Sequence, residues 1–216
     1  MTALEDSLSN TRKDYSSDQL TEETLNPNPF EQFRIWLNLA FTKEVPEPNA
    51  MTLSTTDKDG RPSSRIVLLR NINDCGFVFF TNYQSRKGNE MTDHPYVSLN
   101  FFWPTMERQV RIEGSVEKIA EAESDEYFNS RPRESQLGAW SSNQSTIVKS
   151  RAEFESRLIE LDKQYVDKPV PRPAYWGGYC VIPFRFEFWQ GRPNRLHDRF
   201  QFEKHNSEWK IDRLSP

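Results

Sequence analysis

The chain has 216 residues, and its 28 lysines and arginines are outnumbered by 32 aspartates and glutamates, which gives a formal net charge of −4. The lack of a basic excess argues against a nucleic-acid binder, and no apolar run approaches the roughly 18 residues of a membrane span. Aromatic residues make up 13% of the chain, which predicts a core rich in Phe, Trp and Tyr. The arginines recur in short motifs, which indicates pockets for small anions.

The cysteine count and the first residues bear on the compartment. Two cysteines, Cys75 and Cys180, are too few for a disulfide framework, so a reducing compartment is the simpler interpretation. The first 20 residues are acidic and polar, unlike a secretory signal. We therefore expect a soluble, cytoplasmic protein. The three histidines lack metal-ligand spacing, so no metal site is expected.

The chain begins with a polar stretch. Residues 1–26 are rich in Ser, Thr, Asp, Glu and Asn, which predicts a flexible N-terminal segment before a single domain at 27–216. Asn28 is a good helix cap, and Pro29 suits the first helical position. A core-facing stripe is expected at helical spacing, at Phe30, Phe33, Leu37 and Phe41.

Short strands and a few helices follow. Alternating apolar residues predict strands at 50–56, 61–70, 76–81, 96–103, 107–119 and 209–214. Helices are expected after Ser85, at 121–130, and at 151–167 behind a Ser150–Glu153 capping box. Many short strands with intervening helices favour an α+β protein built on an antiparallel barrel.

Arg65 and Arg70 bound an apolar run in the strand expected at 61–70. Because five positions is an odd separation, the two side chains should face opposite ways unless a bulge intervenes, and so serve different groups. Simple punctuation of the strand is the alternative.

Arg86 and Lys87 fall in the first turn of the helix that Ser85 caps, where they oppose the helix dipole. A bound anion would offset this, since helix N-termini and basic side chains both attract phosphate. Two solvated cations remain an equal alternative.

The stretch 184–200 contains the densest pattern. Phe184, Phe186 and Phe188 alternate as in a strand with one buried face, and Gly191 to Asn194 predict a turn. If the chain after the turn is extended, Arg195, His197 and Arg199 share one face. That face would suit an anionic planar ligand beside Trp189, or else be a solvated edge strand.

Trp189-Gln190-Gly191, followed by Arg195-Leu196-His197-Asp198-Arg199, resembles the C-terminal signature of the pyridoxine (pyridoxamine) 5′-phosphate oxidases, FMN enzymes of vitamin B6 metabolism. The resemblance runs through nearly the whole chain, including Arg65 to Arg70 and Ser130 to Gln136. It implies an FMN-binding split barrel, that is, an antiparallel Greek-key β-barrel with flanking helices. It also implies a homodimer with FMN at the interface.

The resemblance further implies oxidation of pyridoxine 5′-phosphate and pyridoxamine 5′-phosphate to pyridoxal 5′-phosphate, with electrons passing through FMN to oxygen to give hydrogen peroxide. Arg195 and His197 would be the catalytic residues. The implied substrate-binding residues are Arg12, Tyr15, Arg70, Tyr127, Arg131, Ser135, Arg195 and His197. The implied cofactor-binding residues are Arg65, Ile66, Val67, Leu68, Leu69, Arg70, Phe80, Thr81, Arg86, Lys87, Gln109, Gln144, Ser145, Trp189 and Arg199.

The sequence departs from the family pattern at Arg70, where the family commonly has Lys. The positive charge is kept, but the shape and the donor geometry change. Arg12 and Tyr15 match residues that in the family can fold over the substrate as a lid, and incidental residues in a flexible segment are the alternative. Two other functions stay open on the same fold: a flavin or pyridoxal-phosphate binding protein without turnover, and an FMN oxidoreductase for another substrate.

Overall fold

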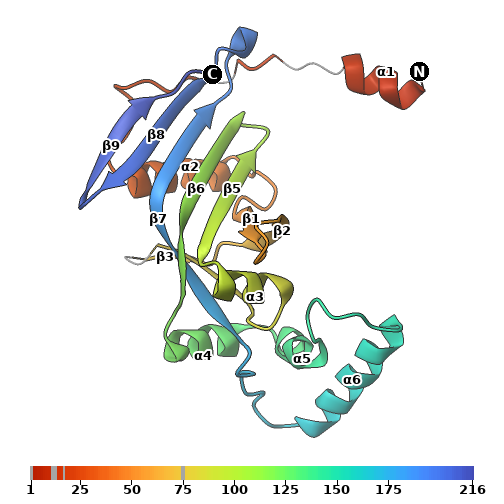
Figure 1. Ribbon diagram of the computed structural model, residues 1–216. Coiled ribbons are helices and arrows are strands. Elements are labelled where there is room, and N and C mark those ends of the chain that lie inside the picture. The colour runs from red at the N-terminus through yellow and green to blue at the C-terminus, as the bar shows by residue number, and fades with distance from the viewer. Residues whose placement is uncertain (1, 11–13, 17, 74–75) are drawn as a thin grey trace. The chain divides into compact units, whose positions relative to one another are not determined.

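The structure is a computed structural model that describes residues 2–10, 14–16, 18–73 and 76–216 (Figure 1). Contacts between residues divide the chain into two units. We call Met1–Pro48, Asn100–Ile112 and Arg185–Pro216 the terminal unit, and Asn49–Leu99 and Glu113–Phe184 the central unit. The single domain expected at 27–216 stays a prediction.

The central unit is built on an antiparallel sheet. Its strand order is β2-β1-β5-β6-β7-β4-β3, and the β1–β2, β3–β4 and β4–β7 pairs are antiparallel. The strands are β1 (Ala50–Thr56), β2 (Pro62–Leu68), β3 (Asn71–Ile72), β4 (Phe77–Asn82), β5 (Tyr96–Trp103), β6 (Arg108–Lys118) and β7 (Trp176–Gln190), of which β5, β6 and β7 also contribute residues to the terminal unit. The bounds predicted for β1 and β5 are confirmed.

Four helices of the central unit are described: α3 (Arg86–Asp93), α4 (Glu121–Ser130), α5 (Arg133–Ser141) and α6 (Arg151–Gln164). A buried cluster of Phe128, Leu137, Leu161, Val170 and Trp176 joins α4, α5 and α6 to the start of β7. The sequence predicted α4 correctly but missed α5, because Pro132 there marks a helix start rather than only a stop. The Ser150 side chain makes no capping hydrogen bond to α6, so the capping box was wrong.

The terminal unit packs α2 (Pro29–Thr42) against aromatic strand residues. Phe33 lies 4.8 Å from Phe101, and Trp36 lies 5.4 Å from Phe188, between ring centroids. The unit also holds α1 (Ala3–Asn10), the short helix η1 (Pro193–Arg195), β8 (Asp198–His205) and β9 (Glu208–Arg213), where β8 pairs antiparallel with β7 and β9.

The cap of α2 was predicted correctly, since the Asn28 side chain accepts hydrogen bonds from the N–H groups of Phe30 and Glu31. The stripe was correct at Phe33 but wrong at Phe41, which is 54% exposed. The buried face instead follows Pro29, Gln32, Phe33, Trp36 and Ala40, which share one side of the helix that is rotated away from Phe41.

Cys180 lies buried on β7 and is disulfide-bonded. The expectation of reduced thiols is therefore wrong for this residue. A count of two cysteines excludes a framework of several bonds, but it does not exclude a single bond. Within the described ranges, no helix combines the length and apolar character of a membrane span.

Candidate functional site

A pocket of about 800 Å³ lies within the central unit, in the size range of small-molecule sites. Its walls come from β2, β4, α3, α4, α5 and the first residue of β7. The predicted site residues that line it are Arg65, Ile66, Val67, Leu68, Arg70, Phe80, Thr81, Arg86, Lys87, Tyr127, Arg131, Ser135, Gln144 and Ser145. The fold thus brings together side chains from segments about 80 positions apart.

One group within this set comprises three neighbouring cations, Arg65, Arg86 and Lys87, which we call the α3 cluster. The Ser85 hydroxyl caps α3 by accepting a hydrogen bond from the Gly88 N–H, as predicted. A Cβ on Gly88 would lie 2.0 Å from the backbone oxygen of Tyr83, so only glycine permits this close start of the helix.

Lys87 is buried although it carries a charge. Its Nζ donates to Thr81 Oγ1 at 3.1 Å, to Gln144 Oε1 at 3.0 Å and to Ser85 Oγ at 3.3 Å, all of them neutral acceptors. Burial, followed by the positive charge of Arg65, lowers the pKa of Lys87 to about 8. A phosphate close to Nζ would favour the charged form of this side chain.

A second group of donors comprises Arg70, Tyr127, Arg131 and Ser135, which we call the α4–α5 cluster. The Tyr127 ring stacks on Phe80 with centroids 3.8 Å apart, and it lies parallel to the ring of Trp176. The Arg131 guanidinium covers Trp176 at 4.6 Å, and that of Arg70 lies 5.9 Å from the Tyr127 centroid.

Arg131 Nη1 is buried and has no hydrogen-bond partner within the described part of the chain. Burial lowers the pKa of Arg131, and the charge of Arg70 acts in the same direction. Leaving a charged donor buried and unpaired costs about 1–3 kcal/mol or more, and an anion bound beside Arg131 would remove that cost. The donor chemistry of the cluster therefore fits a phosphate.

The prediction that Arg65 and Arg70 face opposite ways was wrong, because side chains alternate between two faces only within a strand. β2 ends at Leu68, and the Arg70 N–H donates to the carbonyl of Val78 at 2.8 Å. Arg70 thus follows the path of the chain toward β4, and both arginines line the same pocket, although in different clusters.

Apart from Leu69, the other candidates that the structure describes belong to the terminal unit: Tyr15, Gln109, Trp189, Arg195, His197 and Arg199. The expected extended face was wrong here, since η1 occupies Pro193–Arg195 and β8 begins only at Asp198. Asn194 and Arg195 have φ angles of 56° and 64°, in the left-handed region. Arg12 lies outside the described residues.

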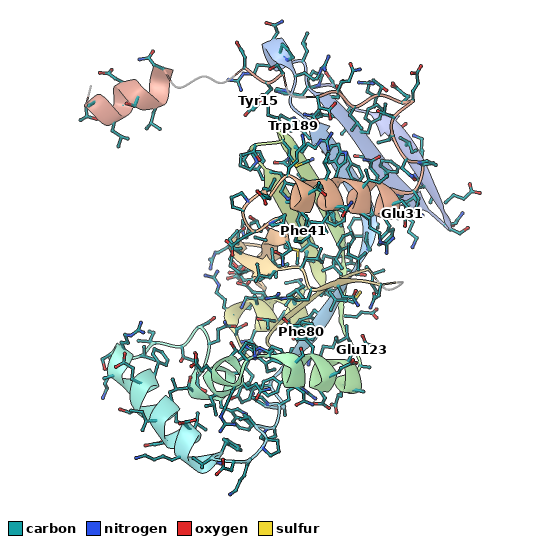
Figure 2. All side chains as sticks on the ribbon, turned by 180° about the vertical axis from the view of Figure 1, so that it is seen from behind. Tyr15, Glu31, Phe41, Phe80, Glu123 and Trp189 are labelled. Carbon is teal, nitrogen blue, oxygen red and sulfur yellow. The ribbon has the colours of Figure 1, made fainter. Side chains whose placement is uncertain are left out.

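Tyr15, Trp189 and His197 form an aromatic cluster in the terminal unit. The Tyr15 ring meets Trp189 edge-on at 5.6 Å and His197 at 5.7 Å between ring centroids. Figure 2 labels Tyr15 and Trp189, which lie near each other. A Cβ on Gly191 would lie 2.7 Å from Tyr15 Cγ, so glycine leaves the space that the ring needs.

The hydrogen bonding of His197 defines its neutral form. Its Nδ1 accepts the N–H of Arg192 at 3.1 Å, so the neutral ring carries its proton on Nε2. Burial, then the charges of Arg195 and Arg199, lower the pKa of His197. At neutral pH this side chain is therefore a hydrogen-bond donor at Nε2 without a positive charge.

The described part of the N-terminal segment, residues 14–16 and 18–26, is attached within the terminal unit. Asp18 pairs with the buried Arg108 at 2.5 Å, the Ser16 N–H donates to Glu107, and the Leu20 N–H donates to Asp198. Folding of this segment over a substrate stays a prediction. The contacts of this segment place Tyr15 beside Trp189 and His197.

The Arg199 guanidinium donates hydrogen bonds to other groups of the protein. Its Nε donates to the buried Glu187 at 2.9 Å and its Nη1 to the carbonyl of Ser215 at 2.7 Å. Glu187 also pairs with Arg111. Gln109 lies half-buried on β6. The cofactor roles of these residues stay predictions.

The sequence analysis missed several residues that line the pocket: Ser63, Ser64, Asn82, Gly138, Ala139, Ser142 and Trp176. Ser63 had a usable signal, since it shares a strand face with Arg65. The α5 residues were missed with their helix, and Trp176 is placed by its pairing with Asn82 across β4 and β7. Leu69, a predicted cofactor contact, is buried and does not line the pocket.

Comparison with known proteins identifies the family of this chain. The family profile described as pyridoxamine 5′-phosphate oxidase matches residues 38–165, and the one described as pyridoxine 5′-phosphate oxidase C-terminal dimerisation region matches residues 176–216. Two relatives named pyridoxine/pyridoxamine 5′-phosphate oxidase, from Synechocystis sp. and Paraburkholderia phytofirmans, are 54% and 52% identical over 97% of this chain, and over 98% and 99% of their own length.

Two solved structures are also similar. PhzG from Burkholderia lata, in complex with tetrahydrophenazine-1-carboxylic acid, is 31% identical with a TM-score of 0.87, over 93% of this chain and all of that chain. A pyridoxamine 5′-phosphate oxidase-related, FMN binding protein from Nostoc punctiforme is 16% identical with a TM-score of 0.69, over 89% of this chain and 99% of that one. The second likeness shows the fold alone.

The fold is thus an α+β split barrel, an antiparallel sheet with flanking helices, as predicted, and its pocket is lined by two clusters of anion-binding side chains. The chain belongs to the pyridoxamine 5′-phosphate oxidase family and is an oxidoreductase.

Proposed function

We propose that this protein binds FMN and oxidises pyridoxine 5′-phosphate and pyridoxamine 5′-phosphate to pyridoxal 5′-phosphate, while oxygen is reduced to hydrogen peroxide. Relatives that carry both substrates in their names, at about half identity over nearly the whole chain, support this proposal. We also propose a homodimer with FMN at its interface, which the match to a dimerisation region supports.

The observation that carries the proposal is the presence of two cationic clusters in one pocket. FMN and each B6 substrate carry one phosphate monoester apiece, so a pocket that holds both ligands needs two places for a dianion. The α3 cluster supplies one and the α4–α5 cluster supplies the other. A pocket for a single phosphorylated ligand would not need the second.

The α3 cluster fits the phosphate of FMN. Lys87 is a buried cation with neutral hydrogen-bond acceptors, and it lies beside a helix N-terminus. Bound FMN would supply the electron chemistry, since it accepts a hydride equivalent from carbon C4′ and passes electrons to oxygen. The protein then has to hold and orient the two ligands.

The α4–α5 cluster would hold the substrate phosphate. Tyr127 and Ser135 would donate from hydroxyl groups, and Arg131 would donate from Nη1, which has no partner among the described residues. Arg70 adds a second guanidinium where the family commonly has an ammonium. Together these donors favour a phosphorylated substrate over its dephosphorylated form.

Arg195 and His197 would orient the pyridine ring and its hydroxyl groups, and Arg195 would help the C4′ group lose its proton. The neutral His197 ring donates from Nε2, which suits a hydroxyl oxygen of the substrate. Tyr15 is a substrate contact in this proposal, because it packs against the same histidine.

An anaerobic titration tests the proposal. Pyridoxine 5′-phosphate is added to the FMN-loaded protein, and the visible absorbance of the flavin is followed. We expect bleaching, and we expect the colour to return when air is admitted. A bound flavin that stays oxidised would contradict the oxidase, and Arg70→Lys would then show whether the departure at this position is the cause.

The likeness to PhzG raises a second candidate, an oxidoreductase for a different ring substrate. The same titration with dihydro-aromatic carboxylic acids separates the two. The α4–α5 cluster favours the phosphorylated substrate, so we expect pyridoxine 5′-phosphate to reduce the flavin faster than a carboxylate does.

A further inference from the structure

Glu90 on α3 is a buried carboxylate that the sequence analysis did not single out and that does not line the 800 Å³ pocket. Its Oε1 accepts from Arg86 Nε at 2.7 Å, and its Oε2 accepts from Arg65 Nη2 at 3.2 Å. Ser63 and Thr55 donate to it as well, at 2.8 and 2.5 Å. One carboxylate therefore contacts two of the three cations of the α3 cluster.

The ionised form of Glu90 is strongly favoured. Burial by itself opposes ionisation, but the hydrogen bonds from Thr55, Ser63 and Arg86 outweigh it and lower the pKa of Glu90 to about 2. The carboxylate is therefore charged throughout the neutral range.

The two arginines are held differently. Arg65 donates from Nη1 to the Leu53 carbonyl and Thr55, and from Nη2 to Ser63 and Glu90, so both terminal nitrogens are engaged. Arg86 contacts Glu90 through Nε, and its side chain is 60% exposed. Among the described residues no hydrogen bond to its terminal nitrogens is found, so these can approach a ligand in the pocket that Arg86 lines.

The charges also match a phosphate. Three cations and one carboxylate leave a net charge of +2 while Lys87 is protonated. A phosphate monoester carries about −1.5 to −2 at neutral pH. Without Glu90 the cluster would carry +3, and two of its cations would lose the group that orients them.

We propose that Glu90 is a positioning residue for a phosphate monoester: it orients Arg65 and Arg86 so that the α3 cluster selects the phosphorylated flavin, FMN, over riboflavin. This inference rests on the proposed FMN function. Two possible roles of Glu90 predict opposite changes in FMN affinity when its charge is removed. If Glu90 only reduced positive charge, its neutralisation would strengthen FMN binding, whereas loss of positioning weakens it.

The test measures dissociation constants of the FMN-free protein for FMN and for riboflavin by quenching of flavin fluorescence. We expect Glu90→Gln to weaken FMN binding by roughly tenfold or more, the loss that a charge-assisted hydrogen bond accounts for, and to leave riboflavin binding unchanged. Asp93→Asn is the matched control, because it removes an exposed carboxylate from the same helix. We expect it to change neither constant.

Glu90→Asp is a second variant that keeps the charge but shortens the side chain, and we expect it also to weaken FMN binding. Unchanged or tighter FMN binding in Glu90→Gln, or an equal loss for FMN and riboflavin, would overturn the inference while leaving the proposed function in place. Failure of the unaltered protein to bind FMN would overturn both.

Discussion

The pocket of the central unit and the turn around Arg195 in the terminal unit carry the proposed site residues on different kinds of backbone. In the pocket, Arg65 lies within β2 and Lys87 in the first turn of α3, and each is held by several hydrogen bonds. In the turn, Arg195 follows Asn194 with a second positive φ angle, and its side chain is exposed.

This difference indicates that the two regions have different roles, one in binding and one in the reaction. A non-glycine residue in the left-handed region costs on the order of 1 kcal/mol, so the turn persists only because its surroundings hold it. Regular elements with many bonds suit the binding of a constant group such as a phosphate. A strained, exposed arginine suits contact with a group that changes during the reaction. Substitutions in the two regions should therefore affect different steps.

The largest effect is expected at the turn. Arg195→Ala should slow anaerobic flavin reduction by at least roughly 100-fold, as is common for a residue that assists proton transfer, while FMN stays bound. Stopped-flow absorbance measures the rate. Arg195→Gly is the matched control, because it also removes the side chain but relieves the positive φ angle. An unchanged rate in Arg195→Ala would contradict the role assigned to this side chain.

The pocket should respond in binding instead. Arg131→Ala removes the guanidinium whose Nη1 has no partner in the part of the chain that the structure describes. We therefore expect the dissociation constant of pyridoxine 5′-phosphate to rise roughly 10- to 100-fold with FMN affinity unchanged. Equilibrium titration measures both constants. Unphosphorylated pyridoxine is the control ligand, and a similar loss for it would argue against a phosphate contact.

The pH dependence of FMN binding sharpens the contrast within the pocket. A phosphate favours protonated Lys87, whose pKa is about 8 without ligand, so affinity should fall as the pH rises through 8. Because a single proton is involved, the FMN affinity can fall by at most about tenfold for each pH unit. Lys87→Arg stays charged and should flatten the profile between pH 7 and 9. The same slope in both proteins would exclude Lys87 as the titrating group.

The smallest effect is expected where the N-terminal segment is attached. Asp18→Asn takes the charged partner from buried Arg108, but half of the Asp18 side chain is exposed, so we expect a loss of about 1 kcal/mol in the free energy of unfolding in urea. Glu22→Gln, in the exposed pair with Arg213, is the control and should change little. Equal losses in the two variants would show that burial of Arg108 is not decisive.

Local signals in the sequence determined much of this protein. The Asn28 and Ser85 caps, the bounds of β1, β5 and α4, and the identity of the cationic residues follow from patterns that span a few positions. The family signatures extended this to the fold and to most residues of the pocket. The turn predicted from Gly191 to Asn194 is present, but its continuation through Arg195 was missed, because a short run of alternating residues does not distinguish an extended strand from a tight turn.

Only the tertiary structure decided which of these residues meet. Glu90 lies 25 positions from Arg65, and Asp18 lies 90 positions from Arg108, yet each pair forms an ion pair. Trp176 joins the ring stack of Phe80 and Tyr127 because β4 pairs with β7. Such contacts depend on strand register and on helix packing, which are summed over the whole fold. The sequence therefore determined the chemical groups of the site, and the packing of distant segments determined their partners.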